Sequence, residues 1–190
     1  MTGEELLSLF RQTGVLMEGH FRLTSGRHSP VFLQCARLLQ YPFYAEQVSR
    51  TLAGMFTGES IDVVVGPAVG GIILAYEIAR AMGARAVFAE REEGKMTLRR
   101  GFTINAGERA LVVEDAVTTG GSVNEVMELV TLNGGGGGGI GMLGARSGGR
   151  VEFGVPARAL VTLEIPSFSP AECPQCRDGV PLVTPKSGRA

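Results

Sequence analysis

Apolar residues recur along the chain at two different spacings, and the spacing changes at short stretches that contain glycine or proline. Helical spacing of apolar residues follows Thr2 and stops at Gly14, and Thr2 with Glu5 has the separation of a capping box, so a short first helix is predicted. Residues 19–34 then combine β-branched and aromatic residues with turn residues, including Pro30. This composition predicts an antiparallel hairpin that is an appendage to the core.

From Pro42 onward, helical and strand patterns alternate. The first helix of this part should cover a sheet with a face formed by Tyr44, Val48, Leu52 and Met55. Strands are predicted over 61–65, 85–89, 111–113, 140–145 and 159–165, with a turn over 66–71 and helices over 72–82 and 122–132. Residues 90–105 are polar without a lasting apolar period and predict a long loop. The alternation predicts an α/β fold, a doubly wound sheet of five parallel strands that binds its ligand beyond their carboxyl ends.

Two stretches do not fit this alternation. Gly134–Gly139 is a run of six glycines, which we interpret as a mobile linker rather than a ligand loop, because it precedes a strand instead of following one. The proline-rich segment after residue 165 contains Cys173-Pro-Gln-Cys176. A single such pair can be half of a zinc site, within one chain or between two copies. However, His20 and His28 are distant in the sequence and Cys35 is isolated, so the simpler expectation is two free thiols.

Composition limits the classes of function. With 190 residues, 44% of them hydrophobic and 19% charged, the chain suits one well-packed domain. A formal net charge of −1 gives no electrostatic reason to expect nucleic acid or an anionic membrane as a partner. No apolar run approaches the roughly 20 residues of a membrane span, and acids stand where a signal peptide would be basic. Three cysteines do not form a disulfide framework. We therefore expect a cytoplasmic protein that binds a small molecule.

The strongest candidate for chemistry is the stretch from Ala110 to Val123, ALVVEDAVTTGGSV. Apolar residues lead into two adjacent acids, Glu114 and Asp115, and a Thr-Thr-Gly-Gly-Ser turn then opens a predicted helix. A helix start offers unpaired N–H groups and the positive end of the macrodipole, so this turn suits a phosphate. The two acids could hold ribose hydroxyls or a metal ion.

Two more loops follow strands of the same predicted sheet and should converge on this stretch. Gly66–Gly71 carries small residues that let backbone amides approach an anion, although a tight turn alone would explain them equally well. The loop over 90–105 carries basic residues interleaved with acids, which alone would indicate a solvated face; the basic residues are Arg91, Lys95, Arg99 and Arg100. The three loops together favour binding of an anionic ligand.

The stretch VVEDAVTTGGSV resembles the phosphoribosyl-pyrophosphate (PRPP) signature of the type I phosphoribosyltransferases. The segment GHFRLTSGRHSPVFLQ looks like the one peculiar to orotate phosphoribosyltransferases, and GPAVGGI and FAEREEGK stand where such enzymes have their other loops. The resemblance spans roughly residues 5–165. It implies the type I phosphoribosyltransferase fold in one domain, with an N-terminal helix and hood over 1–40, a PRPP-binding core over 41–165 and a tail over 166–190.

The resemblance also implies an activity. It is the transfer of the 5-phosphoribosyl group of PRPP to orotate in pyrimidine (UMP) biosynthesis, with Mg²⁺ as cofactor, in a homodimer whose catalytic loop is shared across subunits. Catalytic roles fall on Lys95, Arg91 and Asp115, and Asp115 is also the candidate protein ligand of a Mg²⁺ ion held mainly through PRPP. The implied PRPP-binding residues are Val69, Gly70, Gly71, Arg91, Lys95, Glu114, Asp115, Ala116, Val117, Thr118, Thr119, Gly120, Gly121 and Ser122. The implied orotate-binding residues are Thr24, Ser25, Gly26, Thr118 and Arg146.

Three positions depart from the pattern that the resemblance implies. Gly70 stands where the family often has a lysine, Thr24 where some relatives have a lysine, and Thr97 where many have a histidine.

Two alternatives stay open. A purine phosphoribosyltransferase would share the central signature but should lack Arg146 and the SGRHSP segment. A PRPP-sensing regulator on the same fold would lose the catalytic loop and need a surface for nucleic acid, whereas this chain retains Arg91 and Lys95.

Overall fold

The computed structural model describes residues 1–23, 25–146, 148 and 151–185. Its centre is a six-stranded sheet with the strand order β5-β4-β3-β6-β7-β8. The strands are β3 (Val63–Pro67), β4 (Arg85–Glu92), β5 (Lys95–Leu98), β6 (Arg109–Val117), β7 (Gly136–Ala145) and β8 (Ala157–Thr162). Five of them pair in parallel, and β5 pairs antiparallel with β4 at one edge. The predicted fold class is confirmed, with one additional edge strand.

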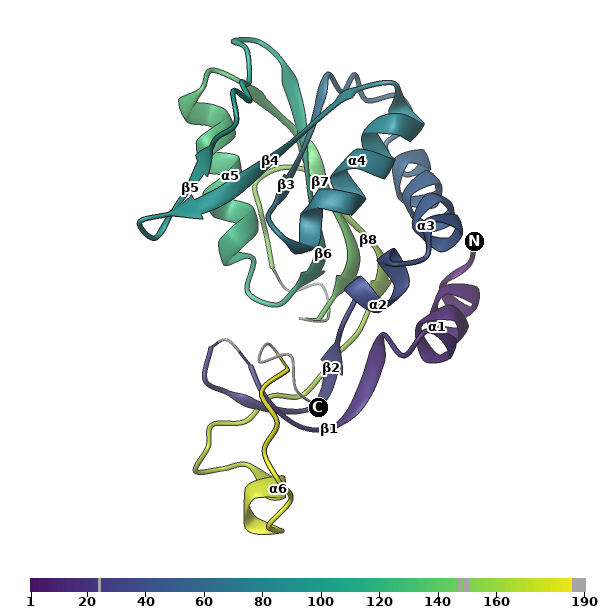
Figure 1. Ribbon diagram of the computed structural model, residues 1–190, viewed down its shortest axis with the longest axis vertical. Helices are drawn as coiled ribbons and strands as arrows, with labels where there is room; N and C mark the ends of the chain where they lie inside the picture. Colours follow the sequence, from purple (N-terminus) through teal and green to yellow (C-terminus); the bar gives the residue numbers. More distant parts are fainter. Residues whose placement is uncertain (24, 147, 149–150, 186–190) are drawn as a thin grey trace.

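Helices cover both faces of this sheet (Figure 1). On one face, side chains of α3 (Pro42–Gly54) and α4 (Gly70–Met82) pack with Val64, Leu111 and Val113. On the other face, α5 (Gly121–Leu132) packs with Val63, Val65 and Val112. Because successive strand residues point to opposite faces, the continuous apolar runs of β3 and β6 fill both layers. Burial of each such side chain contributes about 1.5–3 kcal/mol, which makes the two central strands a firm base for the loops that follow them.

The N-terminal segment lies below the sheet in Figure 1, and side chains such as Leu6, Phe10 and Leu33 join the core cluster of α3 and α4. The helix α1 (Gly3–Gln12) begins with the predicted capping box, in which Thr2 Oγ1 accepts from the N–H of Glu5. The predicted hairpin is confirmed as an antiparallel pair, β1 (Leu16–Arg22) and β2 (His28–Leu33). A short helix, α2 (Ala36–Leu39), then leads into the core.

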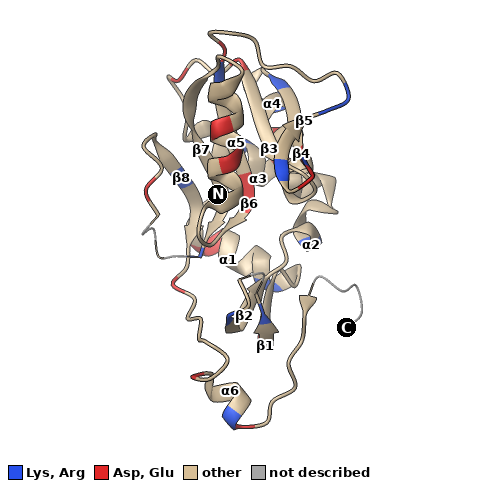
Figure 2. Cartoon of the chain, turned by 90° about the vertical axis from the view of Figure 1, so that its left-hand side faces the viewer, with Lys and Arg blue, Asp and Glu red and all other residues tan. Residues whose placement is uncertain are grey.

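The C-terminal tail lies against this hairpin in two perpendicular views (Figure 1 and Figure 2). Single β-bridges join Phe21 to Val183 and His28 to Phe168, and between them the tail forms the short helix α6 (Pro174–Arg177). The expectation that the two histidines lie far from the cysteine pair of the tail is therefore wrong. The reason is that the tail returns across the hairpin, and separation along the chain carries no information about such a return.

The glycine run also departs from its interpretation as a linker. Its last four residues, Gly136–Gly139, are the first part of β7 and pair with β6. A Cβ atom on Gly137, Gly138 or Gly139 would lie 2.8, 2.4 or 2.7 Å from Met127 Cε, Ile61 Cδ1 or Phe56 Cε1, respectively. These glycines are required by close packing, which a count of glycines cannot distinguish from flexibility.

Two further predictions are corrected. The region predicted as a long loop over 90–105 contains the end of β4 and all of β5, joined by a turn in which Glu93 and Gly94 have φ angles of 48° and 86°. In β5, Met96 and Leu98 alternate with polar residues and pack against the core, but four residues are too few to give a lasting apolar period among charged neighbours. Met55 caps α3 and is 40% exposed instead of extending the buried face of that helix. Within the described ranges, no helix is both long and apolar enough to cross a bilayer.

Candidate active site

The candidate site lies beyond the carboxyl ends of β3 and β6, which are neighbours in the sheet. The chain leaves β3 for α4 on one face and leaves β6 for α5 on the other face. Neighbouring strands whose connections depart to opposite faces leave a crevice between their loops, and ligands of open α/β sheets bind there. Two of the three loops singled out in the sequence therefore meet at this point.

The loop after β3 is built by glycines at close approaches. A Cβ atom on Gly66 would lie 2.4 Å from the carbonyl oxygen of Gly71, and a Cβ atom on Gly71 would lie 3.0 Å from Cα of Gly66. Only glycine fits at both positions. The Ala68–Val69 peptide between them is cis, and Val69 is 82% exposed. The loop thus turns tightly from β3 into α4 at the carboxyl end of the strand, where Val69, Gly70 and Gly71 are predicted to bind PRPP.

The acid pair sits directly opposite this loop. Glu114 and Asp115 are half-buried near the end of β6, and the backbone N–H of Asp115 donates to Glu114 Oε1 at 3.2 Å. A Cβ atom on Gly70 would lie 3.0 Å from Asp115 Oδ2 and 3.1 Å from Oδ1. The Asp115 carboxylate therefore packs on the first residue of α4. This contact brings the two predicted halves of the site together.

The predicted phosphate turn follows at the start of α5. Thr118 and Thr119 are exposed, and Gly120 occupies the N-cap position with a φ of 79° and no side-chain cap. A Cβ atom on Gly120 would lie 2.6 Å from the Phe153 ring, so glycine is required for both conformation and space. The first turn of α5, with Gly121 and Ser122, leaves backbone N–H groups available for an anion.

Arg146, which directly follows β7, lies between the sheet and the N-terminal hairpin. Its backbone N–H donates to the carbonyl of Val117 at 2.8 Å, and its Nη2 donates to the carbonyl of Val31 at 3.1 Å. The side chain is 8% exposed, and Nε is buried without a hydrogen-bond partner among the described residues. Burial lowers the pKa of the guanidinium. A buried cation with an unused donor is suited to receiving an anionic group.

Cys35 is a neighbour of the site that sequence reasoning treated as isolated. Its Sγ lies 3.6 Å from the carbonyl oxygen of Asp115, and its side chain is buried. Burial raises the pKa of the thiol well above its usual value, and the charges of Asp115 and Glu114 raise it further. Cys35 is thus a neutral packing residue beneath the acid pair. No spacing or motif in the sequence signals this contact.

Arg91 and Lys95 lie on the β4–β5 hairpin at the edge of the sheet, and β3 separates β4 from β6 (Figure 1). Arg91 Nη2 forms an ion pair of 2.8 Å with Glu125 Oε2 on α5, and Lys95 is exposed and pairs in register with Glu92. The structure therefore places these two basic residues on the edge hairpin, which the Arg91–Glu125 ion pair joins to α5, the helix that begins at the predicted phosphate turn.

Of the predicted orotate-binding residues of the hairpin, Thr24 lies outside the described residues. Ser25 and Gly26 form the tip between β1 and β2, where Gly26 has a φ of 78° and donates to the carbonyl of Leu23 at 2.9 Å. Arg27 Nε donates to Ser167 Oγ at 3.0 Å. The tip is thus attached to the tail, while Arg146 attaches β2 to the sheet.

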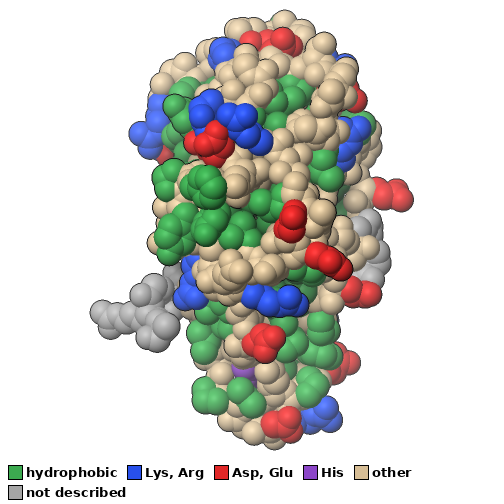
Figure 3. Space-filling view, turned by 90° about the vertical axis from the view of Figure 1, so that its right-hand side faces the viewer, with side chains coloured by type: hydrophobic (Ala, Val, Ile, Leu, Met, Phe, Trp, Pro, Cys, Tyr) green, Lys and Arg blue, Asp and Glu red, His purple; other side chains and the backbone are tan. Residues whose placement is uncertain are grey.

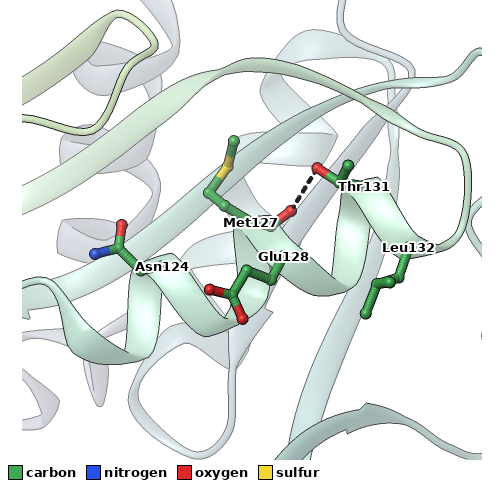
Figure 4. A pocket seen from close by; sticks show the side chains of 5 residues that line it. All are labelled: Asn124, Met127, Glu128, Thr131 and Leu132. Carbon is green, nitrogen blue, oxygen red and sulfur yellow. Dashed lines mark hydrogen bonds between the residues drawn. The ribbon is translucent and has the colours of Figure 1, made fainter.

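A hollow of about 540 Å³ lies elsewhere, on the outer face of α5. Figure 4 shows its lining residues along one helix, where Thr131 Oγ1 donates to the carbonyl of Met127 at 3.0 Å. The lining consists of Asn124, Met127, Glu128, Thr131 and Leu132. It has no converging charges and no second element, so the β3–β6 crevice is the better candidate for chemistry.

Comparison with known proteins agrees with this geometry. Residues 37–135 match the family model described as phosphoribosyl transferase domain. The chain is 56% identical over 187 residues to the orotate phosphoribosyltransferase of Pelotomaculum thermopropionicum, covering 98% of each chain. It is 51% identical over 179 residues to that of Thermus thermophilus, covering 94% of this chain and 98% of the relative.

Among solved structures, the orotate phosphoribosyltransferase of Aeropyrum pernix is 26% identical with a TM-score of 0.70, covering 84% of this chain and 94% of that one. Adenine phosphoribosyltransferases share the fold at lower identity, such as that of Rhodothermus marinus at 20% and a TM-score of 0.67. The fold, the crevice and the near-full-length identity agree: this chain belongs to the phosphoribosyl transferase family, among its orotate phosphoribosyltransferases.

Proposed function

We propose that this enzyme transfers the 5-phosphoribosyl group of PRPP to orotate, forming orotidine 5′-monophosphate and pyrophosphate in pyrimidine (UMP) biosynthesis. The observation that carries the proposal is the contact of the Asp115 carboxylate with Gly70, which joins an acid pair and two helix starts in one crevice. The identity of 56% over 98% of the chain to a named orotate phosphoribosyltransferase supports the choice of base.

In this proposal the crevice holds PRPP along its length. The turn from Ala116 to Ser122 binds the 5′-phosphate through backbone N–H groups at the start of α5. Glu114 and Asp115 accept hydrogen bonds from the ribose 2′- and 3′-hydroxyls. The loop from Val69 to Gly71 binds the pyrophosphate with backbone donors, because Gly70 supplies no side chain there.

Mg²⁺ fits the donor set of this crevice, since it prefers carboxylate and phosphate oxygens. Asp115 is the protein residue that would help to hold it, with PRPP as the main ligand. Bound there, the ion would neutralise charge on the departing pyrophosphate.

Orotate would occupy the space between the sheet and the hairpin. Arg146 pairs with its carboxylate, and Thr118 with the hairpin tip around Thr24, Ser25 and Gly26 encloses the ring. The Nε of Arg146, which has no hydrogen-bond partner among the described residues, supports this assignment, because a buried donor without an acceptor costs free energy that a bound carboxylate would recover.

The chemistry needs little proton transfer. The base attacks the anomeric carbon as pyrophosphate leaves, through a transition state with oxocarbenium character. Lys95 and Arg91 stabilise the charge that develops on the leaving group, and closure of their hairpin excludes water. Because this hairpin lies at an edge of the sheet, we propose that it acts on the site of the second subunit in a homodimer.

Two alternatives make different predictions. A purine phosphoribosyltransferase would not require the buried Arg146, and a PRPP-sensing regulator would require a basic surface. Figure 2 shows basic and acidic residues mixed along the chain, which favours the enzyme.

The decisive experiment incubates the protein with PRPP, Mg²⁺ and either orotate, uracil or adenine, and measures pyrophosphate release. We expect release with orotate alone; release with adenine and not with orotate would overturn the proposal.

A further inference from the structure

Four side chains with metal-binding atoms meet where the tail crosses the hairpin. His20 belongs to β1, His28 begins β2, Cys173 caps α6 and Cys176 lies within α6. One ligand atom from each residue lies within 4.8 Å of all the others. Two histidines and a Cys-x-x-Cys pair from three separate segments are the ligand set of a structural zinc site.

The separations match tetrahedral coordination. Tetrahedral Zn–N and Zn–S bonds of ordinary length place two nitrogens about 3.4 Å apart and a nitrogen and a sulfur about 3.6 Å apart. Here His20 Nε2 lies 3.0 Å from His28 Nδ1 and 3.4 Å from Cys173 Sγ. Cys176 Sγ lies 3.7 Å from His20 Nε2 and 3.2 Å from His28 Nδ1. These four separations agree with tetrahedral coordination to within about 0.4 Å, and all the ligand atoms lie within 4.8 Å of one another.

The surroundings of His20 prepare it for this role. Its Nδ1 lies 2.8 Å from the carbonyl oxygen of Val180, which can only accept a hydrogen bond, so Nδ1 carries the proton. In the neutral ring, the lone pair is then on Nε2, which points at the cluster. A backbone carbonyl that orients the second nitrogen of a histidine is a common support for metal ligation. The exposed fractions of His20, His28 and Cys173 are 2%, 5% and 1%, so most of the cluster is shielded from solvent.

We propose that His20 Nε2, His28 Nδ1, Cys173 Sγ and Cys176 Sγ bind one Zn²⁺ ion that clamps the C-terminal tail to the N-terminal hairpin. Four oxygen-free ligands of this kind select Zn²⁺ over Mg²⁺. In this proposal, the two thiols that the sequence leads us to expect free in the tail serve as metal ligands. It concerns a structural ion, separate from any Mg²⁺ bound with PRPP.

The clamp would fix elements that have little packing of their own. A two-stranded hairpin is marginally stable alone, and α6 has only four residues. Two hydrogen bonds already join the tail to β1. Gln175 Nε2 donates to the carbonyl of Gly19 at 3.0 Å, and the N–H of Val183 donates to the carbonyl of His20 at 2.8 Å. In Figure 3 a histidine is visible at this lower end of the molecule, among hydrophobic side chains. Four coordinate bonds would exceed these contacts in strength.

The clamp also reaches the candidate active site, an inference that rests on the proposed function. His28 lies three residues before Val31, whose carbonyl accepts from Arg146 Nη2, and two residues after Gly26 of the predicted orotate-binding tip. Loss of the ion should therefore weaken orotate binding more than PRPP binding.

The test is the metal content of the full-length protein, purified under reducing conditions without chelator from zinc-supplemented medium. We expect about one Zn²⁺ per chain in the wild type. The variants Cys176→Ser and His20→Asn should lose most of it, while Gln175→Ala, which removes a tail–hairpin hydrogen bond but no ligand, should retain it. Replacement by Co²⁺ should give the visible absorption bands of tetrahedral cobalt with thiolate ligands.

A second measurement applies if a variant fails to fold. Chelation of the wild-type zinc should lower Tm by about 5 °C or more and raise the KM for orotate, and added Zn²⁺ should reverse both. A metal-free wild type that does not bind Zn²⁺ or Co²⁺, or zinc that persists in Cys176→Ser, would show that the cluster is only a hydrogen-bonded network. Because zinc content does not depend on the substrate, it tests the clamp even if orotate is the wrong base.

Discussion

The carboxylate of Asp115 packs against Gly70, so closely that a Cβ atom on Gly70 would lie 3.0 Å from Asp115 Oδ2. Two strand ends and the start of α4 are joined by this single contact. The absence of a side chain at Gly70 therefore leaves space for the carboxylate and for any anion that the loop binds. The loop after β3 therefore offers backbone donors at Gly70 and no charged side chain there.

Gly70→Ala should separate stability from activity. We expect the KM for PRPP to rise about 10-fold or more, because the added methyl group displaces Asp115 and obstructs the loop. The free energy of unfolding should change by less than about 1 kcal/mol, since alanine favours helix. Steady-state kinetics and chemical denaturation measure the two effects. The matched control is Gly54→Ala at the end of α3, where a Cβ atom meets nothing within 4 Å; it should leave the KM unchanged.

Lys95→Ala should lower the rate of the chemical step and leave the binding of PRPP nearly unchanged. We expect kcat to fall by about 10²–10³-fold with little change in the dissociation constant of PRPP, because the proposed role of Lys95 is to stabilise the leaving group. Arg99→Ala, which removes a basic residue just beyond the same hairpin, is the control and should keep most of kcat. An equal loss in both variants would contradict a specific role for Lys95.

The sharing of this hairpin between subunits can be tested by mixing. Lys95→Ala and Asp115→Asn chains, each nearly inactive, should regain about a quarter of wild-type activity when they are unfolded and refolded together, because half of the dimers are then mixed and each contains one intact site. No recovery would mean that each subunit uses its own hairpin.

Arg146→Gln should weaken the binding of orotate and leave the binding of PRPP nearly unchanged. The KM for orotate should rise by about 100-fold, since a desolvated carboxylate would lose its charged partner, while the dissociation constant of PRPP should stay within about threefold. Arg158→Gln on β8 is a suitable control, because Arg158 stacks on Phe56 at 4.7 Å and has no place in the site. A large change in PRPP binding in Arg146→Gln would argue against this division.

The free energy of unfolding should depend on pH through Glu108, which directly precedes β6. Hydrogen bonds from Arg85, followed by those from Asn105, lower the pKa of Glu108 below its usual value. A carboxylate with a lowered folded-state pKa stabilises the protein above the unfolded pKa of about 4.3, and this stabilisation is lost as the pH falls through the folded value. Glu108→Gln should therefore reduce the free energy of unfolding at pH 7 and converge with wild type in acid. A constant difference across the range would refute the assignment.

Sequence patterns among neighbouring residues predicted the elements that depend on contacts between neighbours in the chain. The capping box at Thr2, the alternation from Pro42 onward and the strand–turn–helix pattern around Asp115 each depend on near neighbours, and all were confirmed. The edge strand β5 was missed because it has only four residues, so the alternation of Met96 and Leu98, which pack against the core, is too short to stand out among charged neighbours.

The remaining features depend on contacts between distant segments. Cys35 lies beneath Asp115 although 80 residues separate them, and Cys173 meets His20 across 153 residues. Loop closure over such distances leaves no periodicity in the sequence. The Cys-x-x-Cys spacing marked two of the four side chains of the proposed zinc site, and only the path of the tail brings the two histidines to them.

The glycine run has one more consequence, for the tolerance of the chain to changes in length. Gly138 is the extra residue of a bulge, because Ala110 pairs with Gly137 and Leu111 pairs with Gly139. With identical residues on both sides, loss of one glycine can be absorbed by pairing without the bulge, and every residue from Ile140 to Arg146 keeps its register. In an ordinary strand, an insertion or deletion of one residue shifts the register and turns the core side chains to the wrong face. Here the glycine run can absorb such a change before Ile140, so the register of Arg146 is kept.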